Sequence, residues 1–149
     1  MNSNEQAATV TVSADSSAPM IANIQAGGKA MVLDESSIET GIKAGPDPYD
    51  YIMSALGACT VITLHMYARR KGWPLERAEV TLQHGRVHAK DCESCEDDVA
   101  RISQVTKRLR LTGDLSVEQR ARLKLISAKC PVQKTLAGGI AIETELLED

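Results

Sequence analysis

The sequence lacks phenylalanine altogether and carries little aromatic surface. Among its 149 residues Trp73 is the single tryptophan, and three tyrosines bring the aromatic share to only 3%. The core must therefore be aliphatic, and stacking of rings on nucleic-acid bases is not expected. Basic residues do cluster at 68–77 and 107–111, but the first cluster lies at a predicted helix end, the second alternates along a predicted strand, and the net charge is −3. The sequence thus predicts no nucleic-acid partner.

The first ten residues also lack the basic and apolar stretches that signal secretion. Residues 1–8 are polar, and we expect a disordered N-terminus there. With 43% hydrophobic and 25% charged residues, the remainder is expected to form a single domain over 9–149. We expect a cytoplasmic protein, in which four cysteines suit redox chemistry or metal binding better than structural disulfides.

The stretch from Tyr51 to Met66 has no charged residue and is apolar on every side. This pattern predicts a helix that is buried all round, with Cys59 at its dry centre. The run is too short, and too diluted by polar residues, for a membrane span, so no membrane partner is expected.

Both ends of this helix are marked, which places it at 47–72. Asp47 is a good N-cap, Pro48 fits the first helical position, and Asp50 completes a capping box. Three basic residues suit the negative end of the helix dipole, and Gly72 can take the left-handed conformation that ends a helix.

The other strands and helices do not alternate strictly along the chain. Strands are predicted at 9–13, 20–25, 29–33, 78–88, 102–111 and 140–146, a loop at 34–46, and helices at 116–129 and 131–136. In the helix at 116–129 the residues expected to face inward are Val117, Ala121, Leu125 and Ala128. Because strands and helices are segregated, the predicted fold class is α+β with a mostly antiparallel sheet.

Three motifs together resemble the OsmC/Ohr family of thiol-dependent peroxidases. They are the Gly45-Pro46-x-Pro48 entry, the ALGAC segment that ends at Cys59, and Cys130 followed by Pro131. The resemblance extends over residues 20–146. A further segment at 88–95, with the pattern H-A-x-D-C-x-x-C, resembles one branch of OsmC proteins.

This resemblance implies an OsmC-like fold in which an antiparallel sheet wraps a long buried central helix and two chains form an intertwined homodimer. It also implies that Cys59 is the peroxidatic thiol, which attacks a hydroperoxide, and that Cys130 is the resolving thiol. The partners would be a small-molecule hydroperoxide and a thiol reductant, and no cofactor is expected. The chemistry requires such a pair because a sulfenic acid must be condensed before it is oxidised further.

The sequence departs from the family at the residues that stabilise the thiolate. In the family an arginine from the N-terminal strands, held by a glutamate after the second proline, stabilises the thiolate. Here no arginine precedes Arg69, and Tyr49 occupies the glutamate position with Asp50 one residue later. Asp50 is a candidate catalytic residue across a dimer interface, but its spacing from Cys59 puts the two on opposite helix faces, which favours a capping role.

Cys130 offers an alternative assignment of roles. It lies where a helix begins, so free N–H groups and the positive helix dipole can stabilise its thiolate, whereas Cys59 in mid-helix has neither. Lys129 and Lys134 are close in sequence and could add positive potential. The lower thiol pKa can therefore belong to Cys130.

Two further cysteines and two histidines form a second cluster. His84, His88, Cys92 and Cys95 are residue types that bind structural zinc, but their spacing matches no standard zinc module and the intervening residues are acidic. A second redox dithiol and an inert exposed loop are the alternatives. We expect no bound metal.

The sequence as a whole favours a peroxidase that reduces organic hydroperoxides through Cys59 and Cys130 in oxidative-stress defence. The alternative is a non-catalytic dimer of the same fold that binds an apolar ligand.

Overall fold

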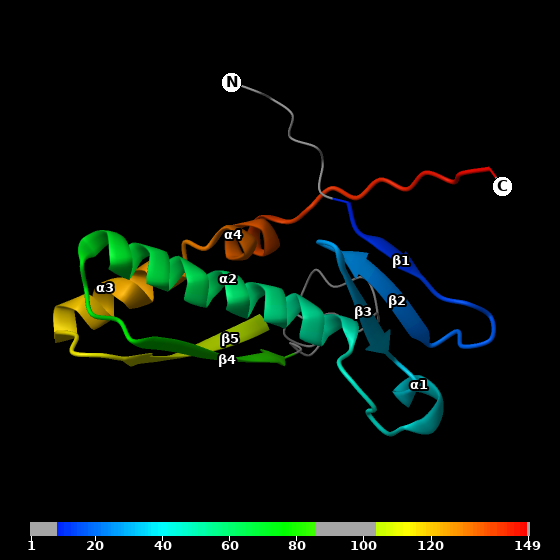
Figure 1. The fold of residues 1–149 in the computed structure, drawn as a ribbon, viewed down its shortest axis with the longest axis horizontal. Helices are drawn as coiled ribbons and strands as arrows, with labels where there is room; N and C mark the ends of the chain where they lie inside the picture. The colour runs from blue at the N-terminus through cyan, green and yellow to red at the C-terminus, as the bar shows by residue number, and fades with distance from the viewer. Residues whose placement is uncertain (1–8, 86–103, 149) are drawn as a thin grey trace, which may run out of the picture. The chain divides into compact units, whose positions relative to one another are not determined.

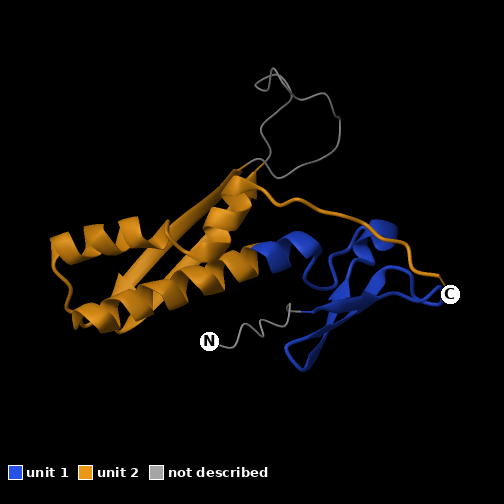
Figure 2. Cartoon of the chain, turned by 90° about the horizontal axis from the view of Figure 1, so that it is seen from above, with its two compact units in different colours: residues 1–52 blue, residues 53–149 orange. Residues whose placement is uncertain are grey.

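The computed structural model describes residues 9–85 and 104–148 (Figure 1). By its contacts the chain divides into two compact units, residues 1–52 and 53–149 (Figure 2). The long helix α2, Pro48–Lys71, begins in the first unit and continues in the second. The single domain over 9–149 stays a prediction, and residues 1–8 lie outside the described residues.

The first unit contains a small antiparallel sheet. Its strands are β1 (Thr11–Ser13), β2 (Ile21–Ala26) and β3 (Lys29–Asp34), in that order across the sheet. Ala26 pairs with Lys29 across the turn, so the two strands predicted at 20–25 and 29–33 form a hairpin. The predicted loop at 34–46 also contains one helical turn, α1 (Ser37–Thr40), too short for periodicity in the sequence to reveal.

The described part of the second unit contains a two-stranded antiparallel sheet, most of α2 and two further helices. The strands are β4 (Arg77–Gly85) and β5 (Gln104–Thr112). The helices that follow α2 are α3 (Val117–Ser127) and α4 (Pro131–Gly138). An α+β class with antiparallel sheets and a long central helix is therefore confirmed.

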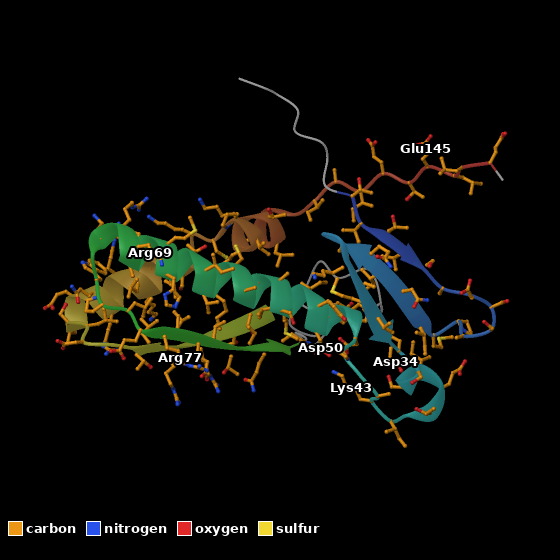
Figure 3. The ribbon with its side chains drawn as sticks, in the orientation of Figure 1. Asp34, Lys43, Asp50, Arg69, Arg77 and Glu145 are labelled. Carbon is orange, nitrogen blue, oxygen red and sulfur yellow. The ribbon has the colours of Figure 1, made fainter. Side chains whose placement is uncertain are left out.

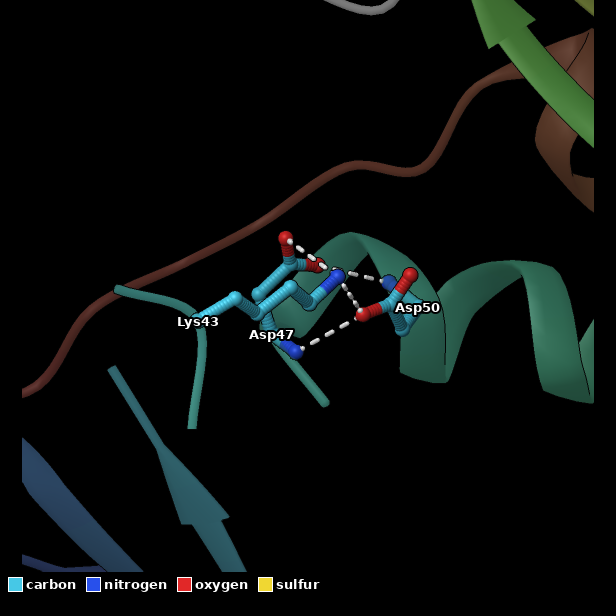
Figure 4. A network of polar contacts seen from close by, with 3 residues as sticks. All are labelled: Lys43, Asp47 and Asp50. Carbon is cyan, nitrogen blue, oxygen red and sulfur yellow. Dashed lines mark hydrogen bonds and ion pairs between the residues drawn. The ribbon is translucent and has the colours of Figure 1, made fainter. Parts of the chain in front are cut away.

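The ends of α2 are those that the sequence predicts. The Asp47 N–H donates to Asp50 Oδ2 at 3.0 Å, and the Asp50 N–H donates to Asp47 Oδ1 at 2.8 Å, so each closes the capping box for the other (Figure 4). At the far end Gly72 has a φ of +70°, and the Trp73 N–H donates to Ala68 O at 2.8 Å.

One face of α2 packs against the core of the second unit. The core residues are Leu64, Tyr67, Ala68, Leu115, Leu123 and Ile126. Gly57 lets the helix approach β4 closely, because an added Cβ would lie 2.9 Å from Leu82 Cδ1. The expectation of burial on every side is not met within one chain, since Ile62 is 58% and Met66 69% exposed. The side chains of this face need a partner if they are to be covered.

The inward face of α3 differs from the one predicted. Val117, Ala121, Leu125 and Ala128 are exposed, and the buried residues are Leu123, Ile126 and Ser127. Both stripes of this helix are apolar, so periodicity alone did not separate them. The flanking residues Leu115 and Cys130, both buried, fix which stripe turns inward.

The predicted strand at 140–146 is absent from the described chain, where residues 139–148 have no regular secondary structure. Ile142 and Leu146 are 85% and 94% exposed. A strand requires an edge on which to form its ladder, and no described strand pairs with this segment. The alternating sequence supplied the pattern but not the neighbouring strand.

Candidate active site

Cys130 occupies the N-cap position of α4. Its Sγ accepts a hydrogen bond from the Gln133 N–H at 3.4 Å, and Pro131 follows at the first helical position. The side chain is completely buried. The sequence predicts this placement at a helix start, and the structure confirms it.

Thr60 of α2 lies beside the Cys130 sulfur. Its Oγ1 is 3.7 Å from Cys130 Sγ and donates to the Leu56 carbonyl oxygen at 2.8 Å. Thr60 is also fully buried. A hydroxyl in this position can accept from a thiol or donate to a thiolate.

Lys107 of β5 extends to the same hydroxyl. Its Nζ donates to Thr60 Oγ1 at 3.1 Å and to the Ser127 carbonyl oxygen at 2.9 Å. A positive charge therefore lies one hydrogen bond away from the group that touches the Cys130 sulfur.

Cys59 is the neighbour of Thr60 in sequence and a neighbour of Cys130 in space. Its thiol hydrogen-bonds to the Cys130 sulfur and lowers the pKa of Cys130. Neither thiol is in a disulfide. Cys59 is half-buried rather than dry, because its face of α2 is open in the single chain. The structure thus brings the two predicted cysteines together.

The surroundings favour the Cys130 thiolate. Burial raises the pKa of this thiol, but the Gln133 N–H, the hydroxyl of Thr60, the thiol of Cys59 and the charge of Lys107 lower it and together prevail. Burial lowers the pKa of Lys107, while the charges of Cys130 and Cys59 oppose that effect. The sequence argument that the helix start favours a Cys130 thiolate is therefore confirmed in direction.

Lys107, like Thr60, is a site residue that the sequence reasoning missed. Alternation along β5 places it on the same side as Val105, Leu109 and Leu111, which are partly buried. A lysine among inward apolar residues was the available signal. The ammonium groups of Lys129 and Lys134, suggested by sequence proximity, make no contact with the Cys130 sulfur among the described residues.

Asp50 lies at the start of α2, where it caps the helix and forms an ion pair with Lys43 (Figures 3 and 4). Asp47 also pairs with Lys43, at 3.6 Å. These contacts bear out the capping role, and a catalytic role for Asp50 stays a prediction.

The second cysteine cluster can be followed only in part. His84 lies on β4, whereas His88, Cys92 and Cys95 lie outside the described residues. Within 9–85 and 104–148 no group of three metal-ligating side chains occurs. The absence of a bound metal therefore stays a prediction.

A pocket of about 500 Å³ opens beside the thiol site. Its lining combines basic and apolar side chains and consists of Lys107, Leu109, Leu111, Arg120, Lys124, Ser127 and Ala128. Lys107 belongs both to this lining and to the Thr60 contact. The pocket has room for a small organic molecule next to the charged group.

Comparison with known proteins agrees with this fold. The profile of the family described as OsmC-like protein matches residues 40–145, so the chain belongs to that family. The family includes proteins of organic hydroperoxide resistance. No curated protein matches the sequence.

Solved structures of the same fold come from several bacteria. The OsmC-like protein of Mycoplasma pneumoniae has 16% identity and a TM-score of 0.70 over 90% of this chain and 89% of its own. An organic hydroperoxide resistance protein OsmC of Legionella pneumophila has 14% identity and a TM-score of 0.62 over 88% and 89%. The organic hydroperoxide resistance protein OhrB of Bacillus subtilis has 16% identity and a TM-score of 0.52 over 85% and 87%. At these identities the likeness shows the fold.

Family membership also decides whether α2 is a core helix or a membrane span. In the described part of the chain, α2 is the one helix whose length and composition would allow it to cross a membrane. In a soluble OsmC-like protein the same helix is the core helix, so it is not a membrane span.

Proposed function

We propose that this protein is a thiol-dependent peroxidase that reduces organic hydroperoxides through Cys59 and Cys130. The observation that carries the proposal is the pair of free thiols in hydrogen-bond contact, surrounded by groups that favour a thiolate. Membership in the OsmC-like family supports it. The protein would act in the cytoplasm in oxidative-stress defence, and the segment at 88–95 would assign it to the H-A-x-D-C-x-x-C branch.

The chemistry uses both thiols in turn. The attacking thiolate bonds to the outer peroxide oxygen, the O–O bond breaks, and the organic fragment leaves as an alcohol after taking up a proton. The attacking cysteine is then a sulfenic acid. The second cysteine, as thiolate, attacks that sulfur and expels the oxygen as water with one further proton, which leaves a disulfide. A thiol reductant restores both thiols by exchange.

Accessibility and charge favour complementary roles for the two residues. Cys59 is half-buried and so is the more accessible thiol, which suits attack on the peroxide. Cys130 is completely buried and has the lowered pKa, which suits resolution of the sulfenic acid as a ready thiolate. The opposite order, with Cys130 attacking, is the alternative that mutation separates.

A homodimer is part of the proposal. The exposed apolar face of α2, which includes Ile62 and Met66, needs covering, and a second chain could also supply an edge for residues 140–146. A catalytic part for Asp50 would require that it act across this interface.

Turnover of cumene hydroperoxide by the protein and its serine variants tests the function. With a dithiol reductant the unmodified protein should consume peroxide, and each hydroperoxide equivalent without reductant should remove two thiols. Cys59→Ser should abolish turnover, whereas Cys130→Ser should stop at a sulfenic acid that dimedone traps.

The same experiment identifies the alternatives. Turnover by Cys59→Ser but not by Cys130→Ser would reverse the roles. If neither substitution matters and no thiols are lost, the protein is a non-catalytic dimer, and the pocket at Leu109 and Leu111 would then take an apolar ligand.

A further inference from the structure

Lys107 occupies a position that the strand pattern reserves for an apolar residue. Along β5 the partly buried residues alternate with exposed ones, and Lys107 lies in the inward row with Val105 and Leu109. An ammonium group at this position loses part of its hydration. Compensating contacts are therefore needed to keep the group charged there.

Among the described residues, the contacts that Lys107 makes do not neutralise its charge. Both hydrogen-bond acceptors, Thr60 Oγ1 at 3.1 Å and Ser127 O at 2.9 Å, are neutral. Within the described residues no carboxylate forms an ion pair with this ammonium group, and the pocket that it lines contains no acidic residue. The acidic groups whose charge acts on it are the thiols of Cys130 and Cys59.

The Thr60 hydroxyl connects this charge to the Cys130 sulfur. Because Oγ1 accepts from Lys107, its single proton is free to point either to Leu56 O, at 2.8 Å, or to Cys130 Sγ, at 3.7 Å. When Cys130 is a thiol, its own proton can point to Oγ1. When Cys130 is a thiolate, the hydroxyl proton can turn from the carbonyl to the sulfur, with Lys107 polarising the O–H bond.

We propose that Lys107 is a positioning residue that stabilises the Cys130 thiolate through Thr60, in place of the arginine that the N-terminal strands lack. The sequence has no arginine before Arg69. The lysines before it are Lys29, on β3, and Lys43, which is engaged with Asp47 and Asp50. The inference deepens the proposed function, because the thiolate concerned is one of its two redox groups.

Among the described residues, few other charged groups lie around this site. Arg120 and Lys124 of α3 line the same pocket as Lys107, and the Cys59 thiol approaches from α2. Arg120 donates to the carbonyl oxygens of Leu111 and Gly113, which holds its guanidinium group at the turn. Lys124 is thus a matched control: a lysine of the same pocket without a contact to Thr60.

The test is a titration of Cys130 as the sole thiol of the chain. Cys59→Ser, Cys92→Ser and Cys95→Ser together leave this one thiol, and ultraviolet absorbance reports its thiolate as the pH is raised. Lys107→Gln, which keeps a hydrogen-bond donor but removes the charge, should raise the midpoint by about one pH unit. Lys107→Arg should restore the midpoint, and Lys124→Gln should leave it unchanged.

Lys107→Met provides a second neutral variant that suits the apolar neighbours on β5, with the same expected shift, and circular dichroism confirms folding. An unchanged midpoint in the neutral Lys107 variants would overturn the inference, as would an equal shift in Lys124→Gln. No peroxide is present, so the result is independent of the proposed function. A shifted midpoint in a protein that consumes no hydroperoxide would refute the peroxidase and keep Lys107 in its role.

Discussion

Thr60 joins the two charged partners of the site, and its hydroxyl is fully buried between them. It accepts from Lys107, and it lies within 3.7 Å of the Cys130 sulfur. Removing this oxygen while keeping the side-chain shape would leave the Lys107 ammonium with one acceptor, the Ser127 carbonyl. A buried donor deprived of its partner destabilises the fold.

Thr60→Val should therefore lower the free energy of unfolding by about 1–3 kcal/mol and raise the pKa of the Cys130 thiol. Denaturant unfolding measures the first effect, and the thiolate titration measures the second. Thr60→Ser keeps the hydroxyl and serves as the control for the titration. If serine raises the thiol pKa as much as valine does, the hydroxyl is not the group that matters.

The lowered pKa of Cys130 makes stability depend on pH. In the folded state the pKa lies below its ordinary value of 9.0, so between the two values the unfolded chain binds more protons. The stabilisation by this thiolate is therefore fully present above 9.0 and is lost as the pH falls through the folded pKa.

We expect the stability difference between the unmodified protein and Cys130→Ser to grow as the pH rises toward 9.0 and then to level off. Thermal unfolding of both proteins across this range checks the trend. The pKa of Lys107 is also lowered in the folded state, so Lys107 makes the stability of both proteins rise with pH. Subtracting the stability of one protein from that of the other reduces this shared contribution. A difference that shrinks with rising pH would contradict the assignment.

At the scale of residues, the sequence predicted the reacting cysteines better than the charged group beside them. Pro131 after Cys130 indicates a helix start, and the structure confirms it as the N-cap. Lys107 was not identified because a lysine in an alternating strand usually faces solvent. Alternation places Lys107 in the inward row of β5, but only the folded structure shows that its ammonium group contacts Thr60.

At the scale of elements, the turn between β5 and α3 depends on Gly113. Its φ is +144°, and an added Cβ would lie 2.1 Å from the Pro74 carbonyl oxygen. This contact is with backbone, which cannot move aside as a side chain can.

Gly113→Ala should destabilise the protein by roughly 3 kcal/mol or more, because both the backbone angle and the contact with Pro74 become unfavourable. Chemical unfolding provides the measurement. Gly138→Ala is the matched control, since a Cβ added there would have nothing within 4 Å and no positive φ is required. Equal stability of the two variants would show that the 113–114 turn relaxes freely.

Helices α2, α3 and α4 could be predicted to within a few residues because their signals are local. Asp47, Asp50 and Gly72 lie within one turn of the ends of α2 and carry the information in their own side chains or conformations. The strand at 140–146 could not be predicted in the same way, since a strand is completed by another segment. The inward face of α3 was predicted wrongly for a related reason. Both faces of this helix carry apolar residues that could be buried, and the buried flanking residues Leu115 and Cys130 fix which face turns inward.

At the scale of the whole molecule, the exposed apolar face of α2 predicts that two chains associate. Light scattering at micromolar concentration should give twice the chain mass of 16.1 kDa. Met66→Asp, at a residue that is 69% exposed in the single chain, should shift this mass toward the monomer, because association would bury the new charge. A monomeric mass for the unmodified protein would rule out the dimer. It would also rule out any role for Asp50 across an interface.

The central claim is that Cys59 and Cys130 form one redox site, and a disulfide between them is its most direct sign. After one equivalent of cumene hydroperoxide without reductant, peptide mass spectrometry should find Cys59 linked to Cys130, and a thiol reductant should reverse the link. The Cys92 and Cys95 thiols should remain outside that bond. Loss of the hydroperoxide with no Cys59–Cys130 link, or an unchanged hydroperoxide with both thiols free, would contradict the account.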